Sequence, residues 1–308
     1  MRHCLARRDP RLRATVTGVR ELSWKDAAGP GLPVRGGSSL AWFGNRLAVA
    51  QDSADAVALV DPADGAVDMV PVPRRADDPP RFDFEACASI GGAGQTEALL
   101  LLSSGSRSPP WRVAALRDPA RPRVTVHAAD ALYAVLHATT AFTGGVLNIE
   151  GALVLRSGLR LFNRGGRGGI NASLDLPRRA LPLQPDAVCA SWRPGRVTRY
   201  ELGLIDGVAL GFTDVAPATG GGTLYLAAAE DSAGPAVDGA VAGSALGIIR
   251  RGRARWIELR EAGGAIHAHK LEGLCLDPAD PDRGWAISDP DDASLPARLC
   301  RIELQGPW

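Results

Sequence analysis

The sequence predicts an all-β chain folded as a five-bladed β-propeller, and three observations lead to this prediction. Glycine and proline, 36 and 23 residues, recur between short apolar runs, which indicates many turns between strands. Long stretches with apolar residues at helical spacing are missing. One pattern also recurs five times: a polar residue, an apolar strand, a turn, a second apolar strand and a polar cluster. We therefore expect one propeller domain over residues 1–308.

The spacing of the five copies suits the blades of a propeller. The opening polar residues are Ser38, Glu85, Glu150, Thr213 and Glu272. A four-stranded blade needs about 40 to 50 residues, and longer loops account for the larger intervals. A six-bladed propeller is the alternative within this class. A sandwich or barrel shares the short strands but not this period.

The expected strands follow from runs of apolar or alternating residues between turn residues. They cover residues 46–52, 56–61, 96–104, 111–117, 124–128, 151–158, 159–165, 222–231, 243–251, 253–260, 284–289 and 297–304. The segment 14–24 precedes the first copy. We expect it to supply the outermost strand of the last blade and so to close the ring.

Two polar positions of each copy are expected to meet around the propeller axis. The start of the first strand and the end of the second strand lie at the same end of a hairpin. The second strands end at Asp52, Ser104, Asn163, Glu230 and Asp289. This geometry explains why a carboxylate such as Glu272 stands at the start of an apolar strand, where an isolated buried charge would be costly.

The predicted ring is rich in carboxylates, which need counter-charges to ionise together. Ca²⁺ or Mg²⁺ would suit such an oxygen-rich set, and the candidate metal ligands are Glu85, Glu150, Glu230, Glu272 and Asp289. Alternatively, Arg107, Arg164 and Lys270 neutralise the ring as a salt-bridged plug without metal. Glu85, Glu150 and Glu272 are the candidate catalytic residues. The candidate ligand-binding residues are Ser38, Asp52, Ser104, Ser106, Arg107, Asn163, Arg164 and Lys270.

Two loops have sequences that could form anion-binding sites. In SGSRSPP (104–110), Arg107 offers a two-pronged donor for a phosphate or carboxylate, and a strand-end turn is the alternative. FNRGGRGG (162–169) lacks the Lys-Ser/Thr ending of a phosphate loop and a helix pattern after it, so we interpret it as a glycine-rich turn between strands.

Composition excludes several classes of function. The net charge of +1 gives no reason to expect a nucleic-acid partner. No run of 18 apolar residues and no signal-peptide pattern occurs, so we expect no membrane association. The five cysteines form no C-x-x-C pair, which suits a reducing compartment. We expect a cytoplasmic monomer that binds a small polar molecule.

The short motifs FEA, SGSR, NIEGA, FNRG, AAAED and KLEGL, followed by a terminal acidic loop before LCRIEL, resemble an uncharacterised family of bacterial propeller-like proteins. This resemblance covers about residues 38–304. More distantly, the Glu-Gly-Leu opening is similar to the propeller group described as the esterase-like activity of phytase. The resemblance implies a propeller with a polar axial site and implies no particular reaction.

Three classes of function are open at this point. A hydrolase of an ester, phosphoester or lactone would use a divalent cation and a carboxylate base. A glycoside hydrolase would use two of the axial carboxylates. A binding or interaction protein would recognise a small polar ligand at the axis or use the site to hold the ring closed.

Overall fold

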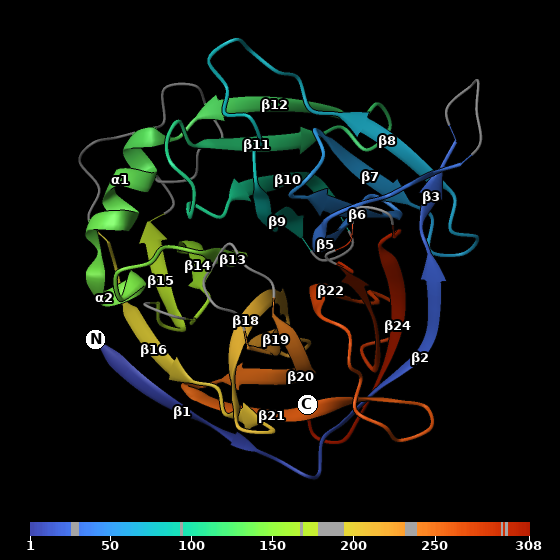
Figure 1. Ribbon diagram of the computed structural model, residues 1–308, viewed down its shortest axis with the longest axis vertical. Helices are drawn as coiled ribbons and strands as arrows, with labels where there is room; N and C mark the ends of the chain where they lie inside the picture. The colour runs from blue at the N-terminus through green and yellow to red at the C-terminus, as the bar shows by residue number, and fades with distance from the viewer. Residues whose placement is uncertain are drawn as a thin grey trace.

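The computed structural model describes residues 1–25, 31–92, 95–166, 169–177, 194–231, 239–290, 292 and 295–308. Within these residues the chain is almost entirely β-structure, with most strands arranged as sheets around a central axis (Figure 1). No helix of the described part is both long enough and apolar enough to span a membrane.

Antiparallel pairing groups most of the described strands into sets of four, which we call the first to the fifth sheet; parallel pairing through β1 and β2 joins the third, fourth and fifth into one 14-stranded sheet. The first contains β5 (Gly37–Phe43), β6 (Arg46–Gln51), β7 (Ala56–Val60) and β8 (Val67–Pro71). The second contains β9 (Phe84–Gly92), β10 (Gln95–Ser103), β11 (Arg112–Arg117) and β12 (Arg123–Ala128). The third contains β13 (Ile149–Leu155), β14 (Gly158–Asn163), β15 (Ala172–Pro177) and β16 (Val197–Glu201). The fourth contains β18 (Val208–Pro217), β19 (Thr223–Asp231), β20 (Ala240–Arg250) and β21 (Arg253–Glu261). The fifth contains β22 (Leu271–Leu276), β23 (Arg283–Ser288), β24 (Arg298–Gln305) and β2 (Arg13–Glu21).

The first strand of each sheet lies nearest the axis. These strands contact one another in the closed cyclic order β5, β9, β13, β18, β22 and back to β5. Each of five apolar clusters fills the space between two neighbouring sheets. Both faces of these sheets are covered. Their central strands therefore have nearly continuous apolar sequences, such as LAVAQ in β6, rather than alternating patterns.

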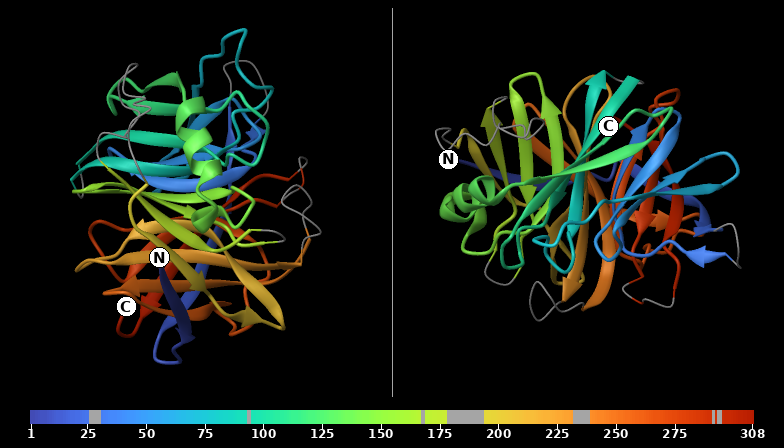
Figure 2. Two further views of the ribbon diagram at one scale, coloured as in Figure 1. Left: turned by 90° about the vertical axis from the view of Figure 1, so that its left-hand side faces the viewer. Right: turned by 90° about the horizontal axis from the view of Figure 1, so that it is seen from above.

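The N-terminal segment ties the outer edges of three sheets together. β1 (Arg2–Arg8) pairs in parallel first with β16 and then with β21. β2 continues with a short parallel pairing to β21 and a long antiparallel pairing to β24. Figure 2 shows β1 in dark blue on the outside of the ring. The predicted pairing of residues 14–24 with the last sheet is therefore present up to Glu21, whereas Ser23 and Trp24 pair with residues 32–33 instead. The sequence analysis did not predict β1.

The smaller elements join or flank these sheets. The described residues contain β3 (Ser23–Trp24), β4 (Leu32–Pro33), β17 (Leu204–Ile205), α1 (Asp130–Ala138) and α2 (Thr140–Thr143). α1 lies at the rim of the ring (Figure 1). It buries Leu132, Tyr133 and Leu136 against the second and third sheets, and the Tyr133 hydroxyl donates a 2.6 Å hydrogen bond to the carbonyl of Ser103.

The buried carboxylate of Asp214 connects inner strands of four sheets. It accepts hydrogen bonds from the backbone N–H groups of Val215 in its own strand, at 2.7 Å, and of Leu274 in β22, at 2.8 Å. It also accepts from the Ser39 hydroxyl of β5, which in turn accepts from the N–H of Cys87 in β9. Burial raises the pKa of Asp214 well above its ordinary value, although the surrounding N–H groups oppose the shift.

Four of the cysteines, Cys4, Cys87, Cys275 and Cys300, lie within the described residues. All four are free and buried, as expected for a protein without disulfides. Burial raises the pKa of both Cys87 and Cys300 to about 12. Cys189 lies outside the described residues.

Candidate functional site

The five opening residues of the sequence repeat occupy one structural position. In each inner strand the pairing register shifts at that residue: at Ser38 in β5, Glu85 in β9, Glu150 in β13, Thr213 in β18 and Glu272 in β22. Such a shift is a β-bulge, in which an extra residue leaves the ladder and its side chain is re-aimed. The recurring pattern therefore marks a repeated bulge on the strands that surround the axis.

Glycine after the bulge allows the inner strands to approach closely. A Cβ atom at Gly151 would lie 2.8 Å from Cγ2 of Val215 in β18. At Gly273, a Cβ atom would lie 2.7 Å from the backbone nitrogen of Leu40 in β5. The Glu-Gly step of β13 and β22 thus combines a re-aimed carboxylate with a tight contact to the next sheet.

Four of the five bulges mark the beginning of the inner strand, as predicted. The exception is Thr213, because β18 already begins at Val208. Thr213 donates its hydroxyl to the carbonyl of Leu271 at 2.6 Å, and Ser38 donates to the carbonyl of Gly36 at 3.1 Å. These two side chains satisfy backbone groups, so the axial site is built from the three glutamates.

Glu85, Glu150 and Glu272 line a single cavity of about 1050 Å³. Nine carboxylate side chains and four cationic side chains line it. The carboxylates are Asp52, Asp83, Glu85, Glu150, Asp206, Glu230, Asp231, Glu272 and Asp289, and the cations are Arg81, Arg107, Arg164 and Lys270. The cavity is therefore predominantly acidic, as the sequence predicted for the axis.

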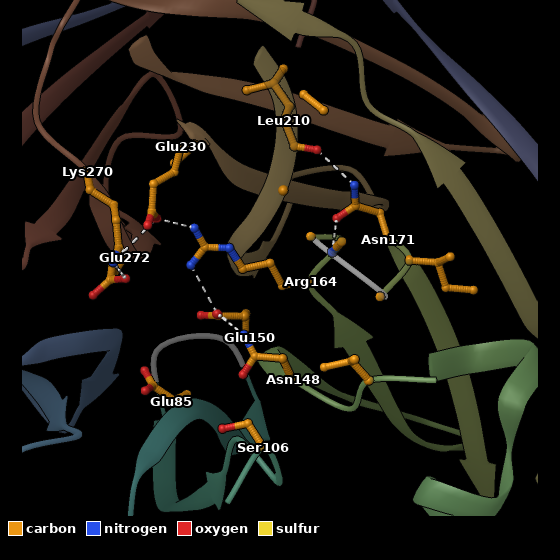
Figure 3. A pocket seen from close by; sticks show the side chains of 18 of the residues that line it. Glu85, Ser106, Asn148, Glu150, Arg164, Asn171, Leu210, Glu230, Lys270 and Glu272 are labelled. Atoms are coloured by element: carbon orange, nitrogen blue, oxygen red, sulfur yellow. Dashed lines mark hydrogen bonds and ion pairs between the residues drawn. The ribbon is translucent and has the colours of Figure 1, made fainter. Parts of the chain in front are cut away.

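An alternating chain of ion pairs crosses this cavity (Figure 3). Arg164 lies between Glu150, at 3.2 Å, and Glu230, at 2.5 Å. Lys270 lies between Glu230, at 3.8 Å, and Glu272, at 2.9 Å. These residues come from the third, fourth and fifth sheets. The row of ion pairs therefore links three sheets through nearly buried side chains.

The electrostatic effects within this chain differ from residue to residue. Burial raises the pKa of Glu272 to about 8, although Lys270 opposes the shift. Burial likewise raises the pKa of Glu150, with Arg164 and Lys270 opposing. Burial alone would raise the pKa of Glu230, but Arg164 and Lys270 outweigh it and hold that pKa below its ordinary value. Among the three glutamates of the ion-pair chain, Glu230 is thus the most readily ionised.

Glu85 lines the cavity but stays outside the ion-pair chain. Its carboxyl group has no hydrogen bond or ion pair to any residue that the structure describes. Burial raises its pKa well above the ordinary value, and the neighbouring carboxylates of Glu150 and Glu272 add to the shift. Glu85 is therefore an unpaired carboxyl group that faces the cavity and keeps its proton to a higher pH than an ordinary glutamate does.

The SGSR loop beside Glu85 is organised around Asp83. This buried aspartate has a positive φ of 57° and accepts a 2.6 Å hydrogen bond from Nε of Arg107. It also accepts from the Ser104 hydroxyl, which lies 2.8 Å from the hydroxyl of Ser106. Arg107 therefore does not join the axial ion pairs, in contrast to the predicted plug.

The structure separates the predicted ligand-binding residues into two groups. Asp52, Ser106, Arg107, Arg164 and Lys270 line the cavity, as do the predicted metal ligands Glu230 and Asp289. The lining of this cavity does not include Ser38, Ser104 or Asn163. Their polar groups bond to protein atoms instead, so their contribution to the site is to position its walls.

Asn163 shows this positioning role most clearly. It is fully buried, and its amide nitrogen donates to the carbonyls of Val146, Arg164 and Ile170. Its oxygen accepts the N–H of Asn148 at 2.7 Å. These bonds fix the backbone on both sides of Arg164.

Sequence reasoning missed several residues that shape the cavity, among them Arg81, Asn171, the turn 206–207 and the first residues of β18, 208–211. Asn171 donates to the carbonyl of Leu210 at 2.8 Å and accepts the N–H groups of Gly165 and Phe212. It thereby connects the glycine-rich turn after β14 to β18. An asparagine two residues after a glycine cluster is a signal for such a role, since its side chain can satisfy turn backbone groups.

The carboxylates of the cavity are poorly arranged to bind a divalent cation. Among the residues that the structure describes, no three acidic, histidine or cysteine side chains form a group that could hold a metal ion. Arg164 and Lys270 already lie between Glu150, Glu230 and Glu272. These residues fit ion pairing within the protein better than coordination of Ca²⁺ or Mg²⁺. Ca²⁺, for example, takes about six to eight oxygen ligands. Metal binding stays a prediction.

These features belong to an all-β, propeller-type fold with an acidic cavity among its inner strands. The chain belongs to a family of unknown function, DUF6910, whose model matches residues 79–293. No curated protein matches the sequence. The family match carries no reference to the phytase-type esterase group, so that resemblance stays a prediction.

Solved structures of diverse proteins are similar in fold at low sequence identity. A candidate glycosidase from Bacteroides thetaiotaomicron has a TM-score of 0.50 at 10% identity, with 90% of this chain and 88% of that chain covered. Glutaminyl cyclase from Myxococcus xanthus has a TM-score of 0.44 at 11% identity, covering 96% and 100%. The PQQ-bound aldose sugar dehydrogenase of Streptomyces coelicolor has a TM-score of 0.46 at 12% identity, covering 97% and 100%. At these identities the likeness concerns the fold alone.

The opposite pKa shifts of Glu85 and Glu230 predict opposite pH dependences. The raised pKa of Glu85 means that wild-type protein loses stability relative to E85Q as pH rises above the ordinary glutamate value of 4.5. The lowered pKa of Glu230 means that wild-type protein gains stability relative to E230Q as pH rises toward and through that value. Urea unfolding of the three proteins between about pH 3 and about pH 9 measures both slopes. If the free energy of unfolding of E85Q and of E230Q differed from that of wild type in the same way at every pH, the pKa values of the two glutamates would not be shifted in opposite directions.

Proposed function

We propose that this chain is a five-bladed β-propeller that binds a small polar organic molecule in its axial cavity. The closed order of five inner strands and the shared bulge support the blade number. The free, buried cysteines suit a cytoplasmic protein. The single observation that carries the binding function is Glu85, which faces the cavity without a described protein partner while its neighbours are paired internally.

The cavity has the properties of a ligand site rather than of a structural plug alone. A volume of about 1050 Å³ accommodates a small molecule, and sites for such molecules commonly measure about 300 to 1,000 Å³. Clustered carboxyl groups with shifted pKa values are typical of functional sites. The ion-pair chain holds one wall of the cavity in place, which leaves Glu85 and the SGSR loop as the wall available to a ligand.

A thermal-shift screen of small polar compounds tests this function. A compound present at a hundred times its dissociation constant stabilises the protein by about 2.7 kcal/mol, which corresponds to a melting shift of roughly 5 to 10 °C. We expect such a shift from one class of organic compound and a reduced shift in E85Q. E201Q, which removes an exposed carboxylate outside the cavity lining, is the matched control.

Ca²⁺, Mg²⁺ and a chelator belong in the same screen. We expect none of the three to change the melting temperature. Stabilisation by Ca²⁺ or Mg²⁺ that is lost on chelation, and lost in the E150Q/E272Q double variant, would instead establish the metal site. No shift from any organic compound would contradict the proposed function.

Acid–base catalysis on the bound molecule is a second candidate, favoured by the raised pKa of the unpaired Glu85. A carboxylic acid with a raised pKa can serve as a general acid, for example toward a glycosidic or ester oxygen. A panel of simple glycosides and esters tests this candidate. Turnover that is absent in E85Q but present in E201Q would support it, and turnover unchanged in E85Q would contradict it.

A further inference from the structure

The hydrogen-bond directions around Glu85 indicate what kind of group the cavity receives. Arg107 donates to one oxygen of Asp83, and the Ser104 hydroxyl donates to the other. A serine hydroxyl carries a single hydrogen, so Ser104 has none left for its second hydroxyl neighbour. Ser104 must therefore accept at its contact with Ser106.

The hydroxyl of Ser106 is thereby fixed as a donor toward the protein. It donates to Ser104 over 2.8 Å, while the backbone N–H of Ser106 also donates to Ser104 at 3.0 Å. Ser106 lines the cavity. Since its one hydrogen is committed to Ser104, it presents only acceptor lone pairs to a ligand.

Asn148 is oriented in the same sense. Its side-chain nitrogen donates a 2.7 Å hydrogen bond to Oε1 of Glu150, an oxygen that also accepts from Arg164. The amide oxygen of Asn148 is left without a partner among the described residues, and Asn148 lines the cavity. Figure 3 shows Glu85, Ser106 and Asn148 around the same part of the cavity. We call these three residues the acceptor wall.

An acceptor wall with one carboxyl group suits a donor-rich cation. A primary ammonium has three N–H donors and one positive charge, which match three acceptor residues and one ionisable carboxyl group. A divalent metal ion would need more oxygen ligands than this wall supplies. A carboxylate or phosphate would meet only acceptors at the Ser106 hydroxyl and the Asn148 oxygen, and a like charge at Glu85 once that group is ionised.

We propose that the ligand carries a primary ammonium group, held by the side-chain oxygens of Glu85, Ser106 and Asn148. This proposal rests on the proposed function, because it names the class of molecule that the same cavity binds. The ammonium group would pair with ionised Glu85, so its binding favours loss of the Glu85 proton. The charged groups that face Glu85 are Asp52, Asp83, Arg107, Glu150 and Glu272.

Isothermal titration calorimetry with butylamine and diaminobutane, against butanol and butanediol of the same length, tests the proposal. We expect the amines to bind wild-type protein and E201Q, and the alcohols to bind at least about tenfold more weakly. E85Q should weaken amine binding by about tenfold or more. S106A should weaken it by about three- to tenfold.

Proton release gives a second readout that folding defects would not imitate. Where Glu85 is still protonated, binding to wild-type protein should release a proton, seen as a heat that depends on the ionisation enthalpy of the buffer. Amine affinity should rise as pH rises from 4.5 toward and through the raised pKa of Glu85. Both effects should be absent in E85Q.

Three outcomes would overturn the ammonium proposal. These are equal affinity for alcohols and amines, amine binding unchanged in E85Q, or competition by calcium chloride alone. Tighter binding of the alcohols would retain the proposed small-molecule function and refute only the ammonium group. Binding of none of the four probes at millimolar concentration would refute the ammonium group, while the wider compound screen decides the proposed function separately.

Discussion

Replacing Arg164 by methionine is expected to lower the free energy of unfolding by about 3 to 5 kcal/mol at neutral pH. The substitution keeps most of the apolar stem but leaves Glu150 and Glu230, both nearly buried, without their shared cation. The loss should shrink as pH falls, because protonation of the stranded carboxylates removes their charge. Chemical unfolding at several pH values measures both effects.

Arg160 in β14 supplies a matched control, four residues before Arg164. Its ion pair with Asp175 is about a quarter exposed on each side, and exposed pairs contribute only about 0 to 1 kcal/mol. R160M should therefore cost far less than R164M. Adding E150Q and E230Q to R164M should recover much of the lost stability, since no buried charge is then left unpaired. Equal costs for the two arginine variants would show that the axial ion pairs do not bind the sheets together.

Replacing Val16 by aspartate is expected to destabilise the protein by more than about 4 kcal/mol, or to prevent folding. Val16 lies in β2, opposite Ile302 of β24, and is 2% exposed within the apolar cluster between the fourth and fifth sheets. An unpaired charge at this position would have to be buried or would separate β2 from β24. The thermal unfolding midpoint and the yield of soluble protein measure the effect.

Val19 lies in the same strand and provides the control. It is 54% exposed and pairs with Cys300 of β24. V19D should change stability by no more than about 0.5 kcal/mol, as is usual for surface substitutions. If V16D were as stable as V19D, the N-terminal strand would not be needed to close the ring of sheets.

The sequence allowed prediction of the axial glutamates because their signal is local. A polar residue at the bulge, glycine or alanine after it, and an apolar run beyond it recur within a few positions, as in Glu150 and Gly151. The convergence of these positions follows from hairpin geometry. The sequence therefore predicts that Glu85, Glu150 and Glu272 lie together, and all three line the cavity.

Features that depend on which residues or strands pair over long sequence distances could not be predicted in the same way. Arg107 and Arg164 look alike as arginines after a strand, yet one pairs with Asp83 and the other with Glu150 and Glu230. β1 pairs with two strands about 200 and 250 residues away, and nothing in RHCLARR specifies them. α1 spans only nine residues, too few for a clear helical period.

The central claim is that the unpaired Glu85 of the axial cavity has a raised pKa, while Glu230, held between Arg164 and Lys270, has a lowered pKa. NMR of the glutamate side-chain carboxyl carbons, with assignment by E85Q and E230Q, measures both states directly. We predict that the resonance missing in E85Q titrates well above the ordinary pKa of 4.5, and that the one missing in E230Q titrates below it. A Glu85 resonance that titrates at or below 4.5 would contradict this account of the site.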